Sequence, residues 1–102
     1  MKNGILLHKA DDDIGVSAMD LKAGEVVQAV TLEGEPVTQI ELVDDVPLSH
    51  KVSMRDIESQ KHIIEYGRPI GYATREIAAG AHVHTHNIAS LRWSGNPQII
   101  EH

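Results

Sequence analysis

Apolar residues in this chain occur in short runs, separated by charged residues and by residues that favour turns. No long stretch repeats its apolar positions at the helical period of about 3.6 residues, so the pattern predicts no helix of ordinary length. It predicts a mostly β domain built from short strands. The predicted strands lie within GILLH, IGVSAM, EVVQAVTL, PVTQIELV, HKVSM, HIIEYG, PIGYAT and AHVHTHN.

Two connections between these runs contain the residues of β-turns. The sequence EGEP at 33–36 joins two alternating segments and predicts a hairpin over residues 26–42. EYGRPIG at 65–71 places Arg68 and Pro69 between two glycines and predicts a second tight turn between strands. This segment lacks the glycine spacing of a dinucleotide-binding loop. Arg68 could meet a substrate carboxylate at the tip, although a structural hairpin is the simpler interpretation.

One outline occurs three times, in residues 15–27, 51–64 and 71–83. Each copy contains a strand, an acidic residue, an aliphatic residue and, four positions after the acid, a turn residue that precedes the next strand. We expect a short helical turn in each connection and a left-handed backbone at the turn residue, which suits glycine. Gln60 occupies that position in the middle copy, so its turn is expected to be strained or differently shaped. The acids and turn residues are Asp20 and Gly24, Asp56 and Gln60, and Glu76 and Gly80.

Composition narrows the class of protein. A chain of 102 residues is expected to form one domain, and its core must be aliphatic because it has no Phe, one Trp and two Tyr. The formal net charge of −6 argues against nucleic acid and against an anionic membrane surface, which both attract clustered Lys and Arg. Cysteine is absent, which excludes disulfides and thiolate metal sites. With no signal peptide and no apolar run of transmembrane length, the expected location is the cytoplasm.

The histidines near the C-terminus are the first candidates for chemistry. His82, His84 and His86 alternate in GAHVHTHN, and on a strand their side chains would lie on one face. Imidazoles at this spacing could bind zinc, iron or nickel, with a further ligand such as His50 from elsewhere. We favour a role in binding an anionic substrate or in facing a partner's active site. The remaining interpretation is a solvated or interface strand without chemistry.

Two other polar segments have weaker signals. His50 and Lys51 open a predicted strand after a loop that contains a proline. A histidine there could act as an acid or base near neutral pH, and the lysine could hold a carboxylate. An ordinary junction with exposed charges is the alternative. The acids of ADDD at 10–13 lack the spacing of a calcium loop, so we interpret this segment as a solvated turn.

Residues 50–93 resemble the small N-terminal unit of the altronate dehydratase family. The matching motifs, in the family's order, are HKVSMRDI, HIIEYGRPIGYAT, EIAAG and HVHTHN, and DDDIGVSAMDLKAGE fits the family's opening segment. Ser49, Gln60 and Glu76 stand where the family outline has Gly, Gly and Asp. The motifs therefore cover nearly the whole chain, with departures at turn positions.

The resemblance implies both a fold and a function. It predicts a SAF-type β-clip over residues 1–93, with 94–102 as a C-terminal tail or the start of a linker. Family members are lyases that remove water from sugar acids such as altronate or galactarate, or sulfite from sulfolactate. This chain would be the small subunit or N-terminal domain of such an enzyme, inactive alone and able to form a homo-oligomer. A large catalytic partner would hold Fe²⁺ or another divalent metal.

The resemblance also suggests residue roles. We expect catalytic roles for His50, His84 and His86. We expect substrate binding by Lys51, Arg68 and Asn87. No metal site is predicted within this chain, with His84 and His86 as weak candidates, and His82 ranks lower because its position varies in the family. The alternatives are a stand-alone module that binds a sugar acid or a metal without catalysis, and a purely structural oligomerisation domain.

Overall fold

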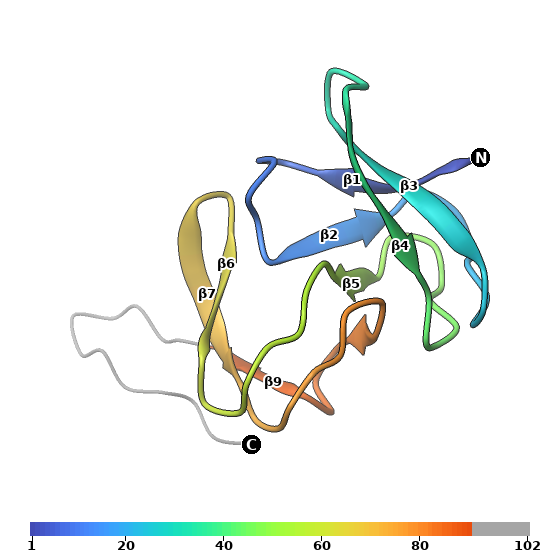
Figure 1. Ribbon diagram of the computed structural model, residues 1–102. Helices are drawn as coiled ribbons and strands as arrows, with labels where there is room; N and C mark the ends of the chain where they lie inside the picture. Colours follow the sequence, from blue (N-terminus) through green and yellow to red (C-terminus); the bar gives the residue numbers. More distant parts are fainter. Residues whose placement is uncertain (91–102) are drawn as a thin grey trace.

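The computed structural model describes residues 1–90, which form two β-sheets and no helix (Figure 1). The larger sheet has the strand order β4-β3-β1-β2-β5-β8, and the smaller has the order β6-β7-β9. Among these strands β1 and β3 pair in parallel, and the other neighbours pair antiparallel. The strands are β1 (Asn3–Leu7), β2 (Ile14–Ser17), β3 (Val26–Thr31), β4 (Pro36–Glu41), β5 (Lys51–Ser53), β6 (His62–Glu65), β7 (Arg68–Ala73), β8 (His82–Val83) and β9 (Ile88–Ser90).

The mostly β prediction is confirmed, and so are both predicted hairpins. β3 and β4 form the first, and β6 and β7 form the second around Tyr66 and Gly67, whose φ angles are 60° and 72°. The expected helical turns are simple turns without a helix in residues 1–90. The predicted boundary at residue 93 and the predicted tail 94–102 lie outside the described residues.

The sequence pattern failed at the last two strands. AHVHTHN was expected to be one strand, but only β8 is extended, and a turn follows it. β9 was not among the predicted strands, yet it pairs with β7. This pairing depends on Gly71, because a Cβ there would overlap the carbonyl oxygen of Ala89. The apolar pattern of β9 alone therefore could not predict this contact between distant segments.

The structure confirms the predicted repeat and contains a fourth copy of it. The left-handed turn residues are Gly24, Gln60 and Gly80, with φ angles of 90°, 73° and 85°, and Ser49 adopts 67° in the same arrangement. Ser49 lies four residues after Asp45, as Gly24 lies four residues after Asp20. The fourth copy escaped detection because its turn residue is Ser and its interior contains Pro47.

The four turns associate as two pairs. The aliphatic residues after the acids form isolated bridges, Leu21 with Val46 and Ile57 with Ile77. In the first pair the carboxylates cap the opposite turn: Asp20 accepts a hydrogen bond from the amide of Leu48 at 2.8 Å, and Asp45 accepts one from Ala23 at 2.9 Å. The carboxylates of Asp20 and Asp45 therefore have a structural role.

Two apolar clusters form the core. One lies around the larger sheet and includes Ile5, Leu7, Val27 and Val52. The other includes Ile14, Ile63 and Val83, and joins the end of β2 to the smaller sheet. Because β2, β8 and the smaller sheet meet in this second cluster, the two sheets are held against each other beside the histidines.

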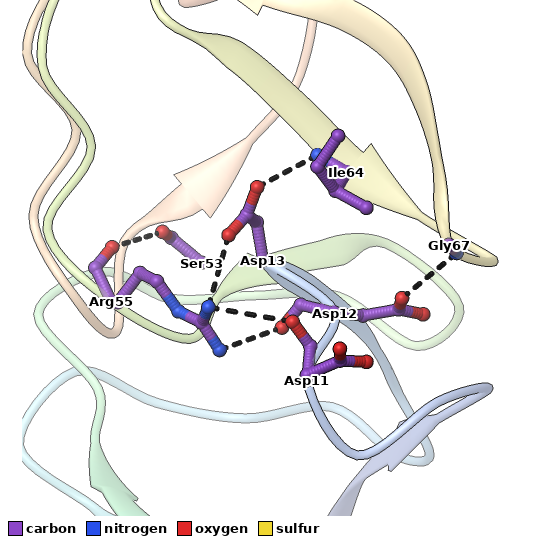
Figure 2. Close-up of polar contacts among 7 residues, drawn as sticks. All are labelled: Asp11, Asp12, Asp13, Ser53, Arg55, Ile64 and Gly67. Atoms are coloured by element: carbon purple, nitrogen blue, oxygen red, sulfur yellow. Dashed lines mark hydrogen bonds and ion pairs between the residues drawn. The ribbon is translucent and has the colours of Figure 1, made fainter.

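The acidic segment 11–13 joins the two sheets (Figure 2). Asp12 is 0% exposed, and its carboxylate accepts hydrogen bonds from the amides of Tyr66 at 3.0 Å and Gly67 at 3.2 Å. Asp13 accepts one from the amide of Ile64 at 2.8 Å and pairs with the guanidinium of Arg55 at 3.1 Å. The interpretation of this segment as a solvated turn is therefore wrong for Asp12, because its carboxylate is buried and binds amides of a hairpin more than fifty residues away.

Candidate functional site

An open pocket of about 600 Å³ lies where the two sheets meet. The larger sheet and the turn after β8 supply most of its polar side chains. The smaller sheet supplies Glu65 and apolar side chains from β7 and β9. The lining residues are Ser49, His50, Lys51, Glu65, Ile70, Val83, His84, Thr85, Ile88 and Ser90.

Four imidazoles gather at one end of this pocket. The His50 Nδ1 and His82 Nε2 atoms lie 2.9 Å apart and form a hydrogen bond between the residue that precedes β5 and the first residue of β8. The ring centroid of His84 lies 5.4 Å from that of His50 and 5.7 Å from that of His82. The His86 ring lies 5.6 Å from the His82 ring. His82, which the sequence analysis ranked lowest, is thus at the centre of the group.

The position of His82 affects its protonation. Burial lowers the pKa of His82 below its ordinary value, and positive charge on His50, His84 or His86 would lower it further. Asp44 acts in the opposite direction, and its carboxylate also accepts a hydrogen bond from the His82 amide at 3.0 Å. The neutral form of His82 is therefore favoured, and it can hold His50 through the ring-to-ring hydrogen bond.

A tight turn positions His84 and His86, and Asn87 closes it. The Asn87 side chain accepts a hydrogen bond from the His84 amide at 2.9 Å and donates one to the His82 carbonyl at 2.9 Å. Asn87 is only 4% exposed. The structure thus places this predicted substrate-binding residue under the turn, where both ends of its amide contact the backbone.

Lys51 and Glu65, which line the pocket from different sheets, form an ion pair. The Lys51 Nζ atom lies 3.0 Å and 3.3 Å from the two carboxylate oxygens of Glu65. Glu65 was missed by the sequence analysis. The available signal was the alternation of HIIE, since Ile63 and Glu65 occupy the inward positions of β6.

The other predicted site residues lie farther from the pocket. His50, Lys51 and His84 are brought together as lining residues, whereas His86 is exposed beyond His82. Arg68 is exposed at the start of β7 and is not among the lining residues. Within residues 1–90 no group of three or more His, Asp or Glu side chains is arranged to hold a metal ion. The same residues include no helix that could cross a membrane.

Fold and pocket together define a small β domain with an open polar site between two sheets. The altronate/galactarate dehydratase SAF domain matches residues 2–91, and the chain belongs to this family. It is 32% identical over 94 residues to the (2R)-sulfolactate sulfo-lyase subunit alpha of Chromohalobacter salexigens, covering 91% of this chain and 100% of that subunit. The family and the fold predicted from the motifs are thereby confirmed.

Longer relatives contain the same domain as a small part. The chain is 34% identical over 87 residues to the altronate dehydratase of Bacillus subtilis, covering 85% of this chain and 16% of that enzyme. It is 42% identical over 76 residues to the altronate dehydratase of Escherichia coli, covering 74% of this chain and 14% of that enzyme. The domain is therefore the small component of lyases, either as a subunit or within a longer chain.

Proposed function

We propose that this chain works with a large catalytic partner to eliminate water, or sulfite, from a hydroxy acid. The observation that carries the proposal is the open pocket, in which His50 and Lys51 from one segment meet His84 from the turn after β8. The pocket combines apolar side chains with a few polar groups, as ligand sites commonly do. Its open side leaves room for a partner to complete it. The proposed location is the cytoplasm, as expected from the sequence.

The chemistry assigned to this chain is proton transfer and substrate binding. Elimination requires a base to take the proton beside the carboxylate while the β-group leaves, and a leaving hydroxyl also needs a proton. His50 and His84 can hold or deliver such a proton at the pocket, since a neutral imidazole has one donor and one acceptor nitrogen. Lys51 can donate a hydrogen bond to a substrate oxygen.

Four further residues are assigned roles in or around the proposed site. We assign His82 and Asn87 as positioning residues, because His82 bonds to the His50 ring and Asn87 fixes the turn that carries His84. His86 points outward beyond the pocket and is proposed to face the partner. Substrate binding by Arg68 remains a prediction. Because Arg68 is exposed on the hairpin, the partner would have to complete its contact with the substrate.

The divalent metal, Fe²⁺ or another ion, is assigned to the large partner. Imidazoles are suitable ligands for iron, but three donors must converge on one point about 2 Å away. The rings of the described histidines pack against one another and do not direct three donor atoms at one position. Asn87 also fixes the turn that carries two of them. The residues present do not fit such a site, so no step of this chain is assigned to the metal.

Reconstitution tests the proposal. The chain would be co-expressed with the large lyase subunit of the same organism and assayed with Fe²⁺ on altronate, galactarate and sulfolactate. We expect turnover by the pair and none by the chain alone. His84→Ala should lower kcat by about 100-fold or more, because it removes a group that transfers a proton.

His62→Ala is the matched control, since His62 is an exposed histidine on β6 outside the pocket. It should leave kcat within about twofold of the unmodified pair. Turnover by the isolated chain, or a His84→Ala pair as active as the His62→Ala pair, would overturn the assignment. Micromolar binding of an acid sugar by the isolated chain without any activity of the pair would favour a stand-alone binding module.

A further inference from the structure

The Lys51–Glu65 pair controls the charge of the pocket. Glu65 is 5% exposed, while the Lys51 side chain is 41% exposed, so the carboxylate is the buried member and the ammonium faces the opening. A buried carboxylate is strongly disfavoured without a partner. Lys51 therefore remains beside Glu65 and cannot present an uncompensated positive charge to a ligand.

The hydrogen-bonding capacity of Lys51 is also limited. An ammonium group has three N–H donors and no acceptor. When each carboxylate oxygen of Glu65, at 3.0 Å and 3.3 Å, takes one donor, a single N–H is left for a ligand. A hydroxyl group suits this pair, since it can accept from Lys51 and donate to Glu65. A second carboxylate or a sulfonate suits it poorly, because such a group only accepts and would lie near the Glu65 charge.

We propose that Glu65 determines substrate specificity by cancelling the charge of Lys51, so that this part of the pocket takes the hydroxylated portion of a monocarboxylic sugar acid. Acids with two anionic groups are disfavoured. The inference rests on the proposed function, in which the pocket faces the substrate. Among the acids named for the relatives, altronate has one anionic group, whereas galactarate has two carboxylates and sulfolactate has a carboxylate and a sulfonate.

Substrate preference in the reconstituted complex tests this inference. The ratio of kcat/KM for altronate to that for galactarate and for sulfolactate would be measured for the unmodified pair and for Glu65→Gln. We expect the unmodified pair to prefer altronate by at least about 10-fold. In Glu65→Gln the freed ammonium should shift both ratios toward the dianionic acids by about 10-fold or more, since opposite charges attract strongly in a partly buried site.

Two further variants separate specificity from folding. Lys51→Gln combined with Glu65→Gln removes both charges, so the preference for altronate should persist although kcat/KM falls for every acid. Glu33→Gln, at an exposed acid in the β3–β4 turn, should change neither ratio. The double variant also leaves no lone charge in the pocket, and it provides the comparison if Glu65→Gln folds poorly.

Each result supports or overturns the inference. Equal losses for all three acids in Glu65→Gln would show a merely structural role for Glu65. A preference of the unmodified pair for galactarate or sulfolactate, with turnover still dependent on His84, would overturn the specificity inference and leave the proposed function standing. A pair that turns over none of the acids would overturn both.

Discussion

The turn residues of the four repeat copies all adopt a left-handed backbone, and two of them have side chains. A residue with a Cβ is disfavoured in this conformation by about 1–2 kcal/mol, whereas glycine is not. Ser49 and Gln60 therefore carry strain that Gly24 and Gly80 avoid. Each of the four amides also donates a hydrogen bond to a backbone carbonyl of another segment, for example Gln60 to Ala73 at 2.7 Å.

The two glycines provide a test at this scale. A Cβ added at Gly24 would meet open space, whereas one added at Gly80 would overlap the carbonyl oxygen of Glu41. We expect Gly24→Ala to lower the free energy of unfolding by about 1 kcal/mol, from backbone strain alone. Gly80→Ala should lower it by about 3 kcal/mol or more, because the backbone must also move. Urea denaturation followed by circular dichroism measures both, and equal losses would contradict the overlap at Gly80.

At the scale of elements, the β6–β7 hairpin depends on one buried carboxylate. Asp12 accepts hydrogen bonds from Tyr66 and Gly67 in the hairpin turn and from Lys9 at 3.2 Å in its own segment. This hairpin supplies Glu65 and Ile70 to the pocket. Asp12 therefore fixes the position of one pocket wall relative to the larger sheet.

Removal of this carboxylate should loosen the hairpin. Asp12→Ala leaves three amides without their acceptor and is expected to lower the free energy of unfolding by about 3 kcal/mol. Hydrogen exchange measured by NMR should show faster exchange at the amides of Tyr66 and Gly67. Asp11→Ala is the control, because Asp11 is exposed and contributes a carbonyl rather than its carboxylate to Arg55. Unchanged exchange in Asp12→Ala would contradict the proposed anchoring.

At the scale of the whole molecule, exposed apolar side chains flank the histidines. Leu48 is 55% exposed, two residues before His50. Val43 is also exposed and precedes Asp44, whose carboxylate binds the His82 amide. An apolar rim beside an open polar pocket is suited to contact with another protein surface. In the proposed complex this rim would contact the large catalytic partner.

Association with that partner can be measured directly. Leu48→Asp should weaken binding of the large subunit by about 10-fold or more, because it introduces a charge at an apolar contact. Leu32→Asp is the matched control for Leu48→Asp, because Leu32 is similarly exposed, at 57%. It lies in the β3–β4 turn, far from β9 (Figure 1). Calorimetric titration would give both dissociation constants. Similar values for the two variants would place the contact elsewhere on the domain.

Much of the strand layout could be predicted from local sequence. The short apolar runs located the first seven strands, and Glu-Gly and Tyr-Gly pairs marked the hairpin turns. The repeat located three left-handed positions, including the strained Gln60. These features depend on neighbours a few residues apart, so a single segment contains the necessary signal.

The amino-acid sequence by itself therefore determined the β class, the turns and, through its motifs, the family. Only the tertiary structure decided which polar groups meet. His50 lies beside His82, Lys51 beside Glu65, and Asp12 beneath a hairpin more than fifty residues away. Such pairings depend on strand order and on the contact between two sheets, and no local pattern encodes either. The histidines of GAHVHTHN accordingly lie on β8 and in the turn after it, which Asn87 fixes, and His82 contacts His50 just before β5.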